Sequence, residues 1–424
     1  MKFDVAVVGA GTAGSAAALH CARRGLRVVV VESGELDGAG ARWVNGVPGW
    51  SFDQAELARP VGDELHGAAV PFHLVAGWQG PAVTAQGMDL LDVDMRLLVA
   101  RLQGLARSAG AELRAKTRVL GLEGRLLRTT GDDVQADWFI DASGLRGARL
   151  LDRPPPARED LCVAAQEVRT CADPQAARAF FQEKGVPPGQ VACFTGIAGG
   201  YSIVNVRVED GHVSLLTGSI PALGHPSGRA LLDDFAREHR WVGPRVFGGS
   251  RALPLRAPYL RLAEGRVALI GDAACQVFAT HGSGIGAGLI AGRMIGESLA
   301  AGRGVWDYAV RWQRRWGGLF AGSERFARFS RQLGVETLAC LVRTGVMGPE
   351  MVADGLDQQP PRLHARALPR TLLGLLRARR AVTPLAPVLV QMARLDRAYR
   401  GFPEGEDGVA AWARRHAGLG VLPD

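Results

Sequence analysis

The hydrophobic pattern at the start of the chain predicts a strand, a helix and a second strand in close succession. Residues 4–9 (DVAVVG) form an apolar, β-branched run, residues 10–25 are rich in glycine and alanine, and residues 26–31 (LRVVVV) form a second apolar run. Short buried strands that are joined by a helix pair in parallel, because the chain must cross over the sheet. Gly25 stands where the helix would end, since glycine readily takes the left-handed conformation of a C-terminal cap. We therefore expect a parallel βαβ unit here.

Farther along, the pattern changes between helical and strand-like spacing. Leu98, Leu102 and Leu105 recur at helical spacing and predict a helix over 92–109. Apolar residues alternate over 161–219, where Asp210-Gly211 is typical of a hairpin turn between antiparallel strands. The other expected segments are an irregular one over 34–90, strands of a small antiparallel sheet over 111–130, a buried strand over 136–144, a helix over 229–240, a strand, glycine turn and helix over 266–300, and mostly helical structure after that, broken near 358–361.

Nucleotide-binding elements thus occur both early and late, with sheet-forming sequence between them. This order predicts an α/β fold in which a Rossmann-like domain is interrupted by an inserted mixed β-sheet and followed by a helical C-terminal region. The expected boundaries are 1–160 and 256–305 for the two parts of the nucleotide-binding domain, 161–255 for the inserted sheet of the substrate domain, and 306–424 for the helical region.

Composition excludes several classes of protein. The 424 residues are 47% hydrophobic and 22% charged, which excludes a disordered chain. The net charge of +8 comes from arginines that are spread along the chain, so we expect no nucleic-acid partner. No apolar run reaches the roughly 18 residues of a membrane span, and the start lacks a secretory signal, so we expect a cytoplasmic protein. The six cysteines show no ligand spacing and predict neither a disulfide framework nor a metal site.

The glycines that follow the first strand carry the strongest chemical signal. Gly9, Gly11 and Gly14 match the G-x-G-x-x-G fingerprint, in which glycines allow a tight turn, a close approach to a pyrophosphate, and close packing of helix on strand. The following helix N-terminus offers free N–H groups to the phosphates. Glu32 ends the second strand, where an acidic side chain binds the hydroxyls of a ribose. Ala13 and Ser33 flank these positions and belong to the same expected site.

A second glycine-rich motif occurs late in the chain. Gly271 and Asp272 follow the apolar run of 266–270, and a carboxylate at the end of a buried strand needs a hydrogen-bond donor such as a ribityl or ribose hydroxyl. The segment from Gly282 through Gly284 and Ile285 starts a helix, where backbone N–H groups can reach a ring carbonyl or a developing anion.

Together with DWFIDASG between them, the motifs GAGTAG…E and GDAA…GSGI resemble FAD-dependent enzymes of the glutathione reductase type. The most similar groups are the geranylgeranyl reductases, the aromatic hydroxylases and the flavin-dependent halogenases. The resemblance implies that FAD is bound with its ADP half at the first motif, its ribityl chain at Asp272 and its isoalloxazine ring beside 282–286. It makes Arg42 and Arg101 candidate partners of the phosphates or adenosine, with ordinary surface arginines as the alternative.

The type of flavin chemistry is constrained by absent motifs. There is no second fingerprint near mid-chain and no CxxC pair, which excludes disulfide reduction and leaves NAD(P)H, bound transiently, or a partner as the electron donor. Halogenases of this fold need a lysine between the fingerprint and mid-chain and a WxWxIP motif, and neither occurs. Geranylgeranyl reductases have a YxWxFP stretch, of which the segment beginning at Tyr201 keeps only the tyrosine, while GDAACQV favours that group.

Several residues remain as candidates for catalysis and substrate contact. His281 should lie close to the flavin, as a hydrogen-bond donor or as an acid/base near neutral pH, unless it is an ordinary loop histidine. Trp43, Trp50, Phe194 and Tyr201 are candidate substrate contacts, with core packing as the alternative. The stretch 362–400 holds nine arginines and one acid, which is compatible with peripheral membrane contact, a solvated helical face or a subunit contact.

The sequence therefore predicts an FAD-dependent oxidoreductase. Our first hypothesis is a monooxygenase that hydroxylates an aromatic or unsaturated substrate, a small metabolite or a tryptophan in a peptide, through a flavin peroxide. The alternative is a geranylgeranyl-reductase-like enzyme that acts on isoprenoid double bonds.

Overall fold

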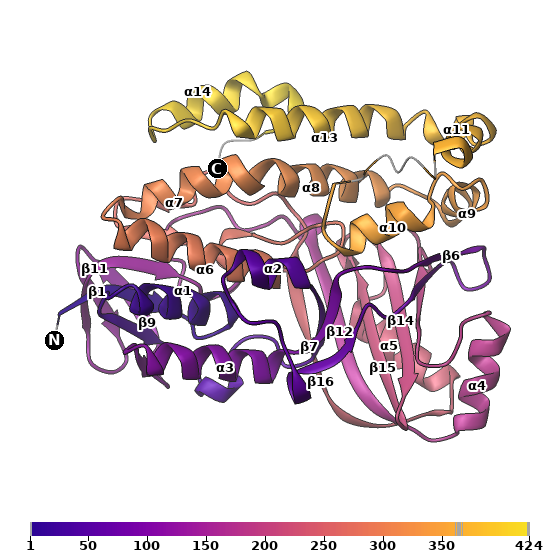
Figure 1. The fold of residues 1–424 in the computed structure, drawn as a ribbon, viewed down its shortest axis with the longest axis horizontal. Helices are drawn as coiled ribbons and strands as arrows, with labels where there is room; N and C mark the ends of the chain where they lie inside the picture. The colour runs from indigo at the N-terminus through magenta and orange to yellow at the C-terminus, as the bar shows by residue number, and fades with distance from the viewer. Residues whose placement is uncertain (1, 361, 363–365, 367, 422–424) are drawn as a thin grey trace.

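The predicted βαβ unit forms the centre of an eight-stranded sheet in the computed structural model, which describes residues 2–360, 362, 366 and 368–421 (Figure 1). Six strands follow the order β17-β18-β11-β1-β2-β8, and the β9–β10 hairpin is joined to β11. The four valines of β2 are all buried, as expected of a parallel strand that is covered on both faces. The strands are β1 (Lys2–Val8), β2 (Val28–Val31), β8 (Glu112–Arg114), β9 (Val119–Glu123), β10 (Leu126–Thr129), β11 (Val134–Asp141), β17 (Ala263–Glu264) and β18 (Val267–Leu269).

Three helices pack around this sheet: α1 (Thr12–Arg23), α3 (Met95–Ser108) and α6 (Ile285–Ala300). Small residues let α1 and α6 approach closely, since a Cβ on Gly292 would lie 2.8 Å from the Cβ of Ala16. The helix predicted over 92–109 is confirmed, and it begins at Met95 because the Asp94 carboxylate accepts a hydrogen bond from the backbone N–H of Arg96 at 2.9 Å.

The inserted sheet has seven strands in the order β16-β12-β15-β14-β13-β5-β6. Its predicted hairpin is confirmed, because Asp210 and Gly211 both have positive φ and join β14 to β15. The strands are β5 (Phe72–Ala76), β6 (Ala82–Ala85), β12 (Leu161–Cys171), β13 (Val191–Thr195), β14 (Ser202–Glu209), β15 (His212–Ser219) and β16 (Val242–Pro254), and the helices α4 (Pro174–Glu183) and α5 (Gly228–Glu238) belong to the same region.

The segment 34–90, which the sequence indicated as irregular, contains four short strands and the start of a fifth. β5 and β6 join the inserted sheet, where β5 pairs in parallel with β13, so the expected boundary at 161 does not separate the two sheets. The remainder forms a three-stranded sheet in the order β3-β7-β4, which a Gly- and Pro-rich sequence concealed. Its elements are β3 (Val44–Pro48), β4 (Leu65–Ala68) and β7 (Leu90–Asp94), with the short helices η1 (Leu36–Gly38), α2 (Gly49–Gln54) and η2 (Gly62–Glu64) between them.

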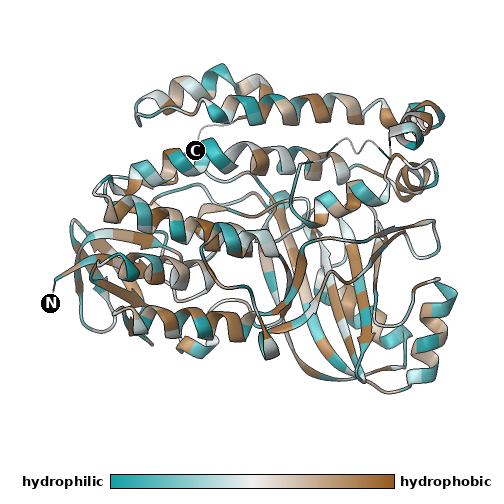
Figure 2. Cartoon of the chain, viewed as in Figure 1, coloured by the Kyte–Doolittle hydropathy of each residue, from teal (hydrophilic) through white to brown (hydrophobic). Residues whose placement is uncertain are grey.

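Two further layers of helices lie over the sheets (Figure 1). α13 packs along α8, and Figure 2 shows hydrophobic and hydrophilic residues interspersed along these helices. The helices are α7 (Gly304–Trp312), η6 (Gln313–Gly317), α8 (Gly318–Ser330), α9 (Val335–Arg343), α10 (Pro349–Leu356), α11 (Leu368–Arg377), α12 (Arg379–Val382), α13 (Leu385–Arg400) and α14 (Gly408–Arg415), and short turns elsewhere are η3 (Arg158–Asp160), η4 (Pro221–Leu223), η5 (Gly271–Ala274) and η7 (Ala417–Leu419). Among the described helices, none combines the length and the apolar character needed to cross a membrane.

Candidate functional site

A cavity of about 1190 Å³ extends from the glycine turn after β1 to the inserted sheet. Its walls bring together most of the side chains and glycines that the sequence singled out, although they come from segments far apart in the chain. The predicted residues in the wall are Gly9, Gly11, Ala13, Glu32, Ser33, Trp43, Tyr201, Gly271, Asp272, His281, Gly282, Gly284 and Ile285.

The glycine turn at one end of the cavity is packed too tightly for side chains. Gly9 has φ of +99°, and a Cβ there would lie 2.6 Å from the carbonyl oxygen of Ala142, at the end of β11. A Cβ on Gly14 would overlap the carbonyl oxygen of Gly9. Gly14 is therefore not part of the cavity wall but supports the turn from within α1. The turn leaves backbone N–H groups at the start of α1 facing the cavity, which suits a pyrophosphate.

Glu32 lies at the carboxyl end of β2, beside this turn. Its carboxylate accepts hydrogen bonds from the backbone N–H groups of Ala10 at 2.9 Å and Gly34 at 3.0 Å. These bonds hold the side chain in the cavity wall. The hydroxyl of Ser33 also donates to this carboxylate, at 3.1 Å. Since a carboxylate has lone pairs for about four hydrogen bonds, Glu32 can still accept one from a ribose hydroxyl.

Asp272 provides the strongest test of whether the cavity fits the ribityl chain of FAD. Its side chain is half-buried in the cavity wall, and no residue in the described part of the chain donates a hydrogen bond to it. Burial raises the pKa of Asp272, and the positive charge of Arg251 opposes the shift. A buried carboxylate without a donor is costly, and hydroxyl groups of a bound ligand would remove that cost. The surroundings of Asp272 therefore fit the ribityl chain of FAD, as the motif predicted.

The segment before α6 brings three candidate residues together. Gly282 has φ of +74°, and a Cβ there would lie 3.0 Å from the hydroxyl oxygen of Tyr201. Gly284 immediately precedes α6, so the free N–H groups of that helix N-terminus face the cavity. Tyr201 immediately precedes β14 of the inserted sheet. Its closeness to Gly282 therefore places this end of β14 beside the expected position of the flavin ring.

His281 stands in the same segment and lines the cavity. Its Nδ1 has no hydrogen-bond partner in the described structure. Burial lowers the pKa of His281 to about 4, so the imidazole is neutral at pH 7. Burial therefore counts against an acid/base that titrates near neutral pH, and the unpartnered Nδ1 supports the alternative of a neutral hydrogen-bonding group.

Two arginines that the resemblance implied for FAD lie elsewhere. Arg101 donates two hydrogen bonds to the carboxylate of Glu64, at 2.7 and 2.8 Å, which use its guanidinium in an ion pair. Arg42 is exposed and is not part of the cavity wall. The structure does not bring either arginine to the cavity wall; the surface alternative describes Arg42, whereas Arg101 is half-buried in its ion pair.

Two of the aromatic candidates also lie outside the cavity. Phe194 is fully buried on the other face of β13, 5.1 Å from the ring of Trp78, because side chains alternate along a strand and its neighbours Cys193 and Thr195 face the cavity. Trp50 stacks on Trp316 with ring centroids 5.5 Å apart, and its indole N–H donates to the carbonyl oxygen of Asp357 at 2.8 Å. Both residues therefore contribute to core packing, which was the alternative to substrate contact.

Sequence reasoning missed Arg251 and one whole face of the inserted sheet. Arg251 on β16 lines the cavity, donates to the carbonyl oxygen of Gly40, and lies 5.9 Å from the ring of Trp43. No motif marks it. The sheet face could have been found from the alternation along β14 and β15. Its cavity-lining residues include Leu74, Cys193, Thr195, Ile203, Asn205, Arg207, Ser214, Leu216 and Gly218.

Comparisons with known proteins agree with this geometry. The sequence profile of the family described as FAD dependent oxidoreductase matches residues 4–63. The digeranylgeranylglycerophospholipid reductase of Sulfolobus acidocaldarius is 24% identical over 98% of this chain and 96% of its own length. The menaquinone reductase of Mycolicibacterium smegmatis is 30% identical over 73% of this chain and 79% of its own length.

Solved structures share the fold. A geranylgeranyl bacteriochlorophyll reductase-like protein from Thermoplasma acidophilum superposes with a TM-score of 0.70 at 18% identity, over 91% of this chain and 99% of its own. The halogenase PltM, in a mutant solved with FAD, gives a TM-score of 0.62 at 11% identity, over 98% of this chain and 96% of its own. The chain therefore belongs to the superfamily of FAD-dependent oxidoreductases that contains the geranylgeranyl reductases, as the two glycine motifs predicted.

Proposed function

We propose that this protein is an FAD-dependent reductase that saturates carbon–carbon double bonds in the isoprenoid chain of a lipid. The observation that carries the proposal is the continuation of the cavity beyond the ring position. Past Tyr201, the wall includes the apolar side chains of Ile203 on β14, Leu216 on β15 and Leu74 on β5, on a face of the inserted sheet that also carries polar residues such as Asn205.

The opposite wall of this extension is also apolar. It is formed by residues of the helical layer, among them Phe326, Leu333, Leu338, Met347, Met351 and Leu356. A long hydrocarbon chain gains about 0.8 kcal/mol for each CH₂ group that it buries in such surroundings. The names of the two relatives described above, both reductases, support the same substrate class.

Saturation of a double bond adds two electrons and two protons to two carbon atoms. Bound FAD in its reduced form supplies the electron pair. The residues of this chain bind and orient the lipid: Tyr201 lies against the ring-side glycine segment, and the neutral His281 offers one ring N–H as a hydrogen-bond donor. We propose NAD(P)H as the transient source of reducing equivalents.

Hydroxylation of an aromatic substrate, the first hypothesis from the sequence, requires a dry pocket closed around the ring. The apolar extension favours a longer ligand than such a pocket would hold. In addition, Trp50 and Phe194, two of the four aromatic residues expected to contact an aromatic substrate, lie outside the cavity.

The test uses FAD-loaded protein that has been reduced under nitrogen and mixed with a polyprenyl lipid. We expect reoxidation of the flavin, followed by its absorbance, and a product that has gained two hydrogen atoms for each double bond lost. The same reaction is run in labelled dioxygen. A product that carries labelled oxygen would instead establish the hydroxylase and overturn the proposal.

A further inference from the structure

The outer surface of the C-terminal helices carries apolar side chains that no other part of the described chain covers. Leu373 and Leu376 on α11 are 46% and 76% exposed, and Leu389 and Val390 on α13 are 38% and 50% exposed. These four residues are called the C-terminal patch. The helices are held from below by other residues, since Leu385 and Leu395 of α13 are buried. The patch is therefore not needed for the packing of the helices.

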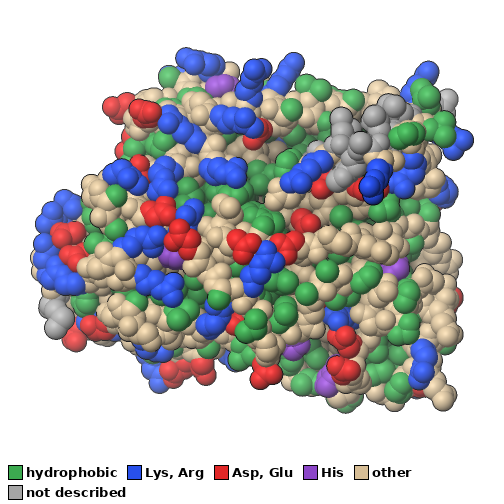
Figure 3. All heavy atoms as spheres, in the orientation of Figure 1, with side chains coloured by type: hydrophobic (Ala, Val, Ile, Leu, Met, Phe, Trp, Pro, Cys, Tyr) green, Lys and Arg blue, Asp and Glu red, His purple; other side chains and the backbone are tan. Residues whose placement is uncertain are grey.

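Exposed arginines lie on the same helices as this patch and on α12 between them. The residues Arg377, Arg379, Arg394 and Arg397 are exposed and have no ion-pair partner in the described part of the chain. Asp396 is the one acidic residue of 362–400 in the sequence, and its carboxylate binds Arg400. Figure 3 shows basic side chains along the edge formed by α13 and α14, and hydrophobic ones at the corner where α11 lies.

We propose that the C-terminal patch and its arginines dock this protein onto an anionic lipid bilayer. Helices with exposed leucine on one side and arginine beside it lie in the interface of a membrane, where the apolar groups enter the acyl region and the arginines attract anionic headgroups. Charge complementarity thus selects an anionic bilayer over a neutral apolar surface. The inference rests on the proposed function, because it explains how a lipid substrate reaches the cavity.

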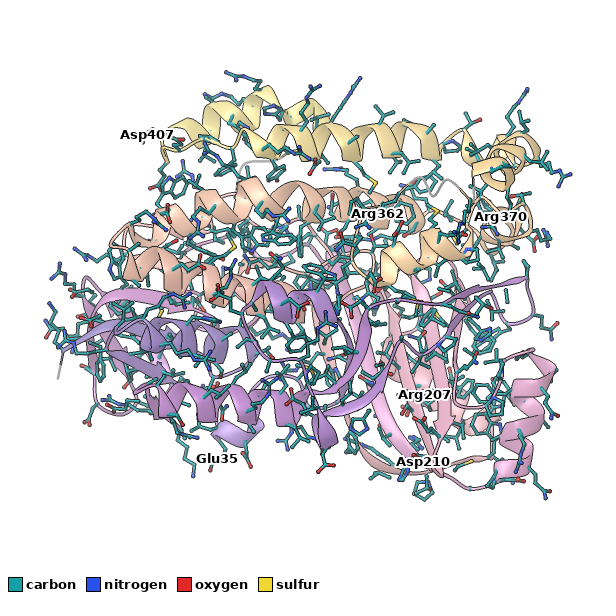
Figure 4. The ribbon with its side chains drawn as sticks, viewed as in Figure 1. Glu35, Arg207, Asp210, Arg362, Arg370 and Asp407 are labelled. Atoms are coloured by element: carbon teal, nitrogen blue, oxygen red, sulfur yellow. The ribbon has the colours of Figure 1, made fainter. Side chains whose placement is uncertain are left out.

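The cavity extends to the same corner of the molecule. Met347, two residues before α10, and Met351, in its first turn, line it, as does the exposed Pro360, which precedes α11 in the chain. α11 is attached to α10 by an ion pair between Arg370 and Glu350 at 2.7 Å, and Figure 4 labels Arg370 at this corner. The hydrocarbon part of a membrane lipid could therefore pass from the bilayer into the cavity beside the patch.

The other end of the cavity is less suitable for a hydrocarbon. Three exposed residues there, His66, Glu209 and His212, are polar, and Arg207 forms ion pairs with Asp92 at 2.8 Å and with Glu209 (Figure 4 labels Arg207 and Asp210 in this region). An isoprenoid chain that entered here would have to pass charged groups. The apolar end near α10 and α11 is the more favourable entrance.

The test measures sedimentation of the FAD-loaded protein with vesicles of phosphatidylcholine alone or mixed with phosphatidylglycerol. We expect binding to the mixed vesicles that weakens in high salt, and little binding to phosphatidylcholine. Two variants, Leu376→Ser/Val390→Ser and Arg394→Glu/Arg397→Glu, should each lower the binding constant at least about tenfold. Matched controls at exposed positions elsewhere, Leu120→Ser and Arg240→Glu, should bind as the wild type does.

Flavin content verifies that each variant is folded, and reduction of a detergent-dispersed lipid separates docking from catalysis. If the wild type reduces that lipid but does not sediment with anionic vesicles, the docking proposal is overturned while the proposed function stands. If vesicle binding depends on the patch but no isoprenoid lipid is reduced, the proposed function fails and the docking surface remains. Equal loss of binding in the patch variants and the controls would also overturn the docking proposal.

Discussion

The carboxylate of Glu32, at the end of β2, accepts a hydrogen bond from the backbone N–H of Ala10 at 2.9 Å, in the glycine turn that follows the neighbouring strand β1. Ala10 stands between Gly9 and Gly11 of the fingerprint, so the acid that ends β2 is fixed by the turn that ends β1. The acid that we expect to bind the ribose and the turn that we expect to bind the phosphates are thereby held at a set separation before any ligand arrives.

Replacement of Glu32 by alanine should weaken FAD binding without unfolding the protein. Hydrogen bonds to a charged group contribute about 1.5–3 kcal/mol, so the dissociation constant for FAD should rise by roughly ten- to a hundredfold. Titration of flavin-free protein with FAD measures this. The variant Glu35→Ala is the control, because Glu35 is exposed and pairs only with the exposed Lys116 in the described structure. An unchanged affinity in Glu32→Ala would mean that the acid serves only the turn.

Replacement of Gly14 by alanine should destabilise the turn itself. A methyl group there would overlap the carbonyl oxygen of Gly9, so either the helix or the turn must move, at a cost of about 2 kcal/mol or more. Gly104 in α3 is a matched control, since it is exposed and a Cβ there meets nothing within 4 Å. Gly104→Ala should raise the melting temperature slightly, because alanine favours the helix by up to about 1 kcal/mol, whereas Gly14→Ala should lower it.

Most of the candidate residues that the structure brings to the cavity wall belong to local motifs. The turn at Gly9, the acid at Glu32 and the carboxylate of Asp272 each depend on residue spacing within a local strand–turn–helix unit, and this spacing can be recognised in the sequence. The pairing of strands that are far apart in the chain cannot be recognised in this way. Nothing in the residues of β5 indicates that this strand leaves the first domain and pairs with β13, about 120 residues later by their register.

The direction in which a single side chain points was the second feature that the sequence could not predict. Phe194 was a substrate candidate because it lies in the inserted sheet, but the face of β13 that it occupies depends on which side carries α5. Phe235 of α5 lies in the same apolar cluster as Phe194, and this packing turns Cys193 and Thr195 toward the cavity. A strand that is covered on both faces by apolar residues gives no pattern from which to choose the side.

His281 should affect turnover more than it affects flavin retention. As a neutral donor in the cavity wall it stabilises a bound ring, and its removal in His281→Ala should lower kcat by about tenfold to a hundredfold. His281→Asn, which keeps an N–H donor, should recover part of this loss. Because burial lowers the pKa of His281 to about 4, the pH profile of kcat for the wild type should show no step from this residue near pH 6.5. A step near 6.5 that His281→Ala abolishes would contradict this assignment.

His20 should make the protein sensitive to acid. It is 1% exposed on α1, and burial first, with the charge of Arg24 second, lowers its pKa from 6.5 to about 4. Below pH 6.5 His20 is protonated in the unfolded chain, whereas in the folded protein it stays neutral until the pH approaches 4. The free energy of unfolding therefore falls between pH 6.5 and 4. The loss is on the order of 3 kcal/mol when the pH reaches the lower value.

The variant His20→Gln cannot take up this proton, so its stability should depend less on pH over the same interval. Urea unfolding at pH 7, 6, 5 and 4.5 measures the difference between the two proteins at each pH. Other groups titrate in both proteins and cancel in the comparison. Parallel stability curves for wild type and variant would show that His20 is protonated in the folded state.

Bulky substitutions along the inserted sheet should shorten the lipid that the enzyme accepts. Ile203 and Leu216 both line the cavity, at different distances from Tyr201, which lies against the ring-side segment. Ile203 is two residues from Tyr201 along β14. Leu216 pairs with Asn205, which is two residues farther along that strand. Side chains on one face of a strand recur at about every 7 Å, so a tryptophan at each position blocks the cavity at a different depth. Leu216→Trp should lower kcat/KM for a long polyprenyl lipid by about tenfold or more while a short prenyl substrate still reacts, since overpacking costs about 1–3 kcal/mol. Ile203→Trp should impair the reduction of both substrates, because it closes the cavity nearer to the ring.

FAD content and reduction of the bound flavin serve as the controls for folding. Equal effects of Leu216→Trp on the short and the long substrate would show that the isoprenoid chain does not follow this sheet.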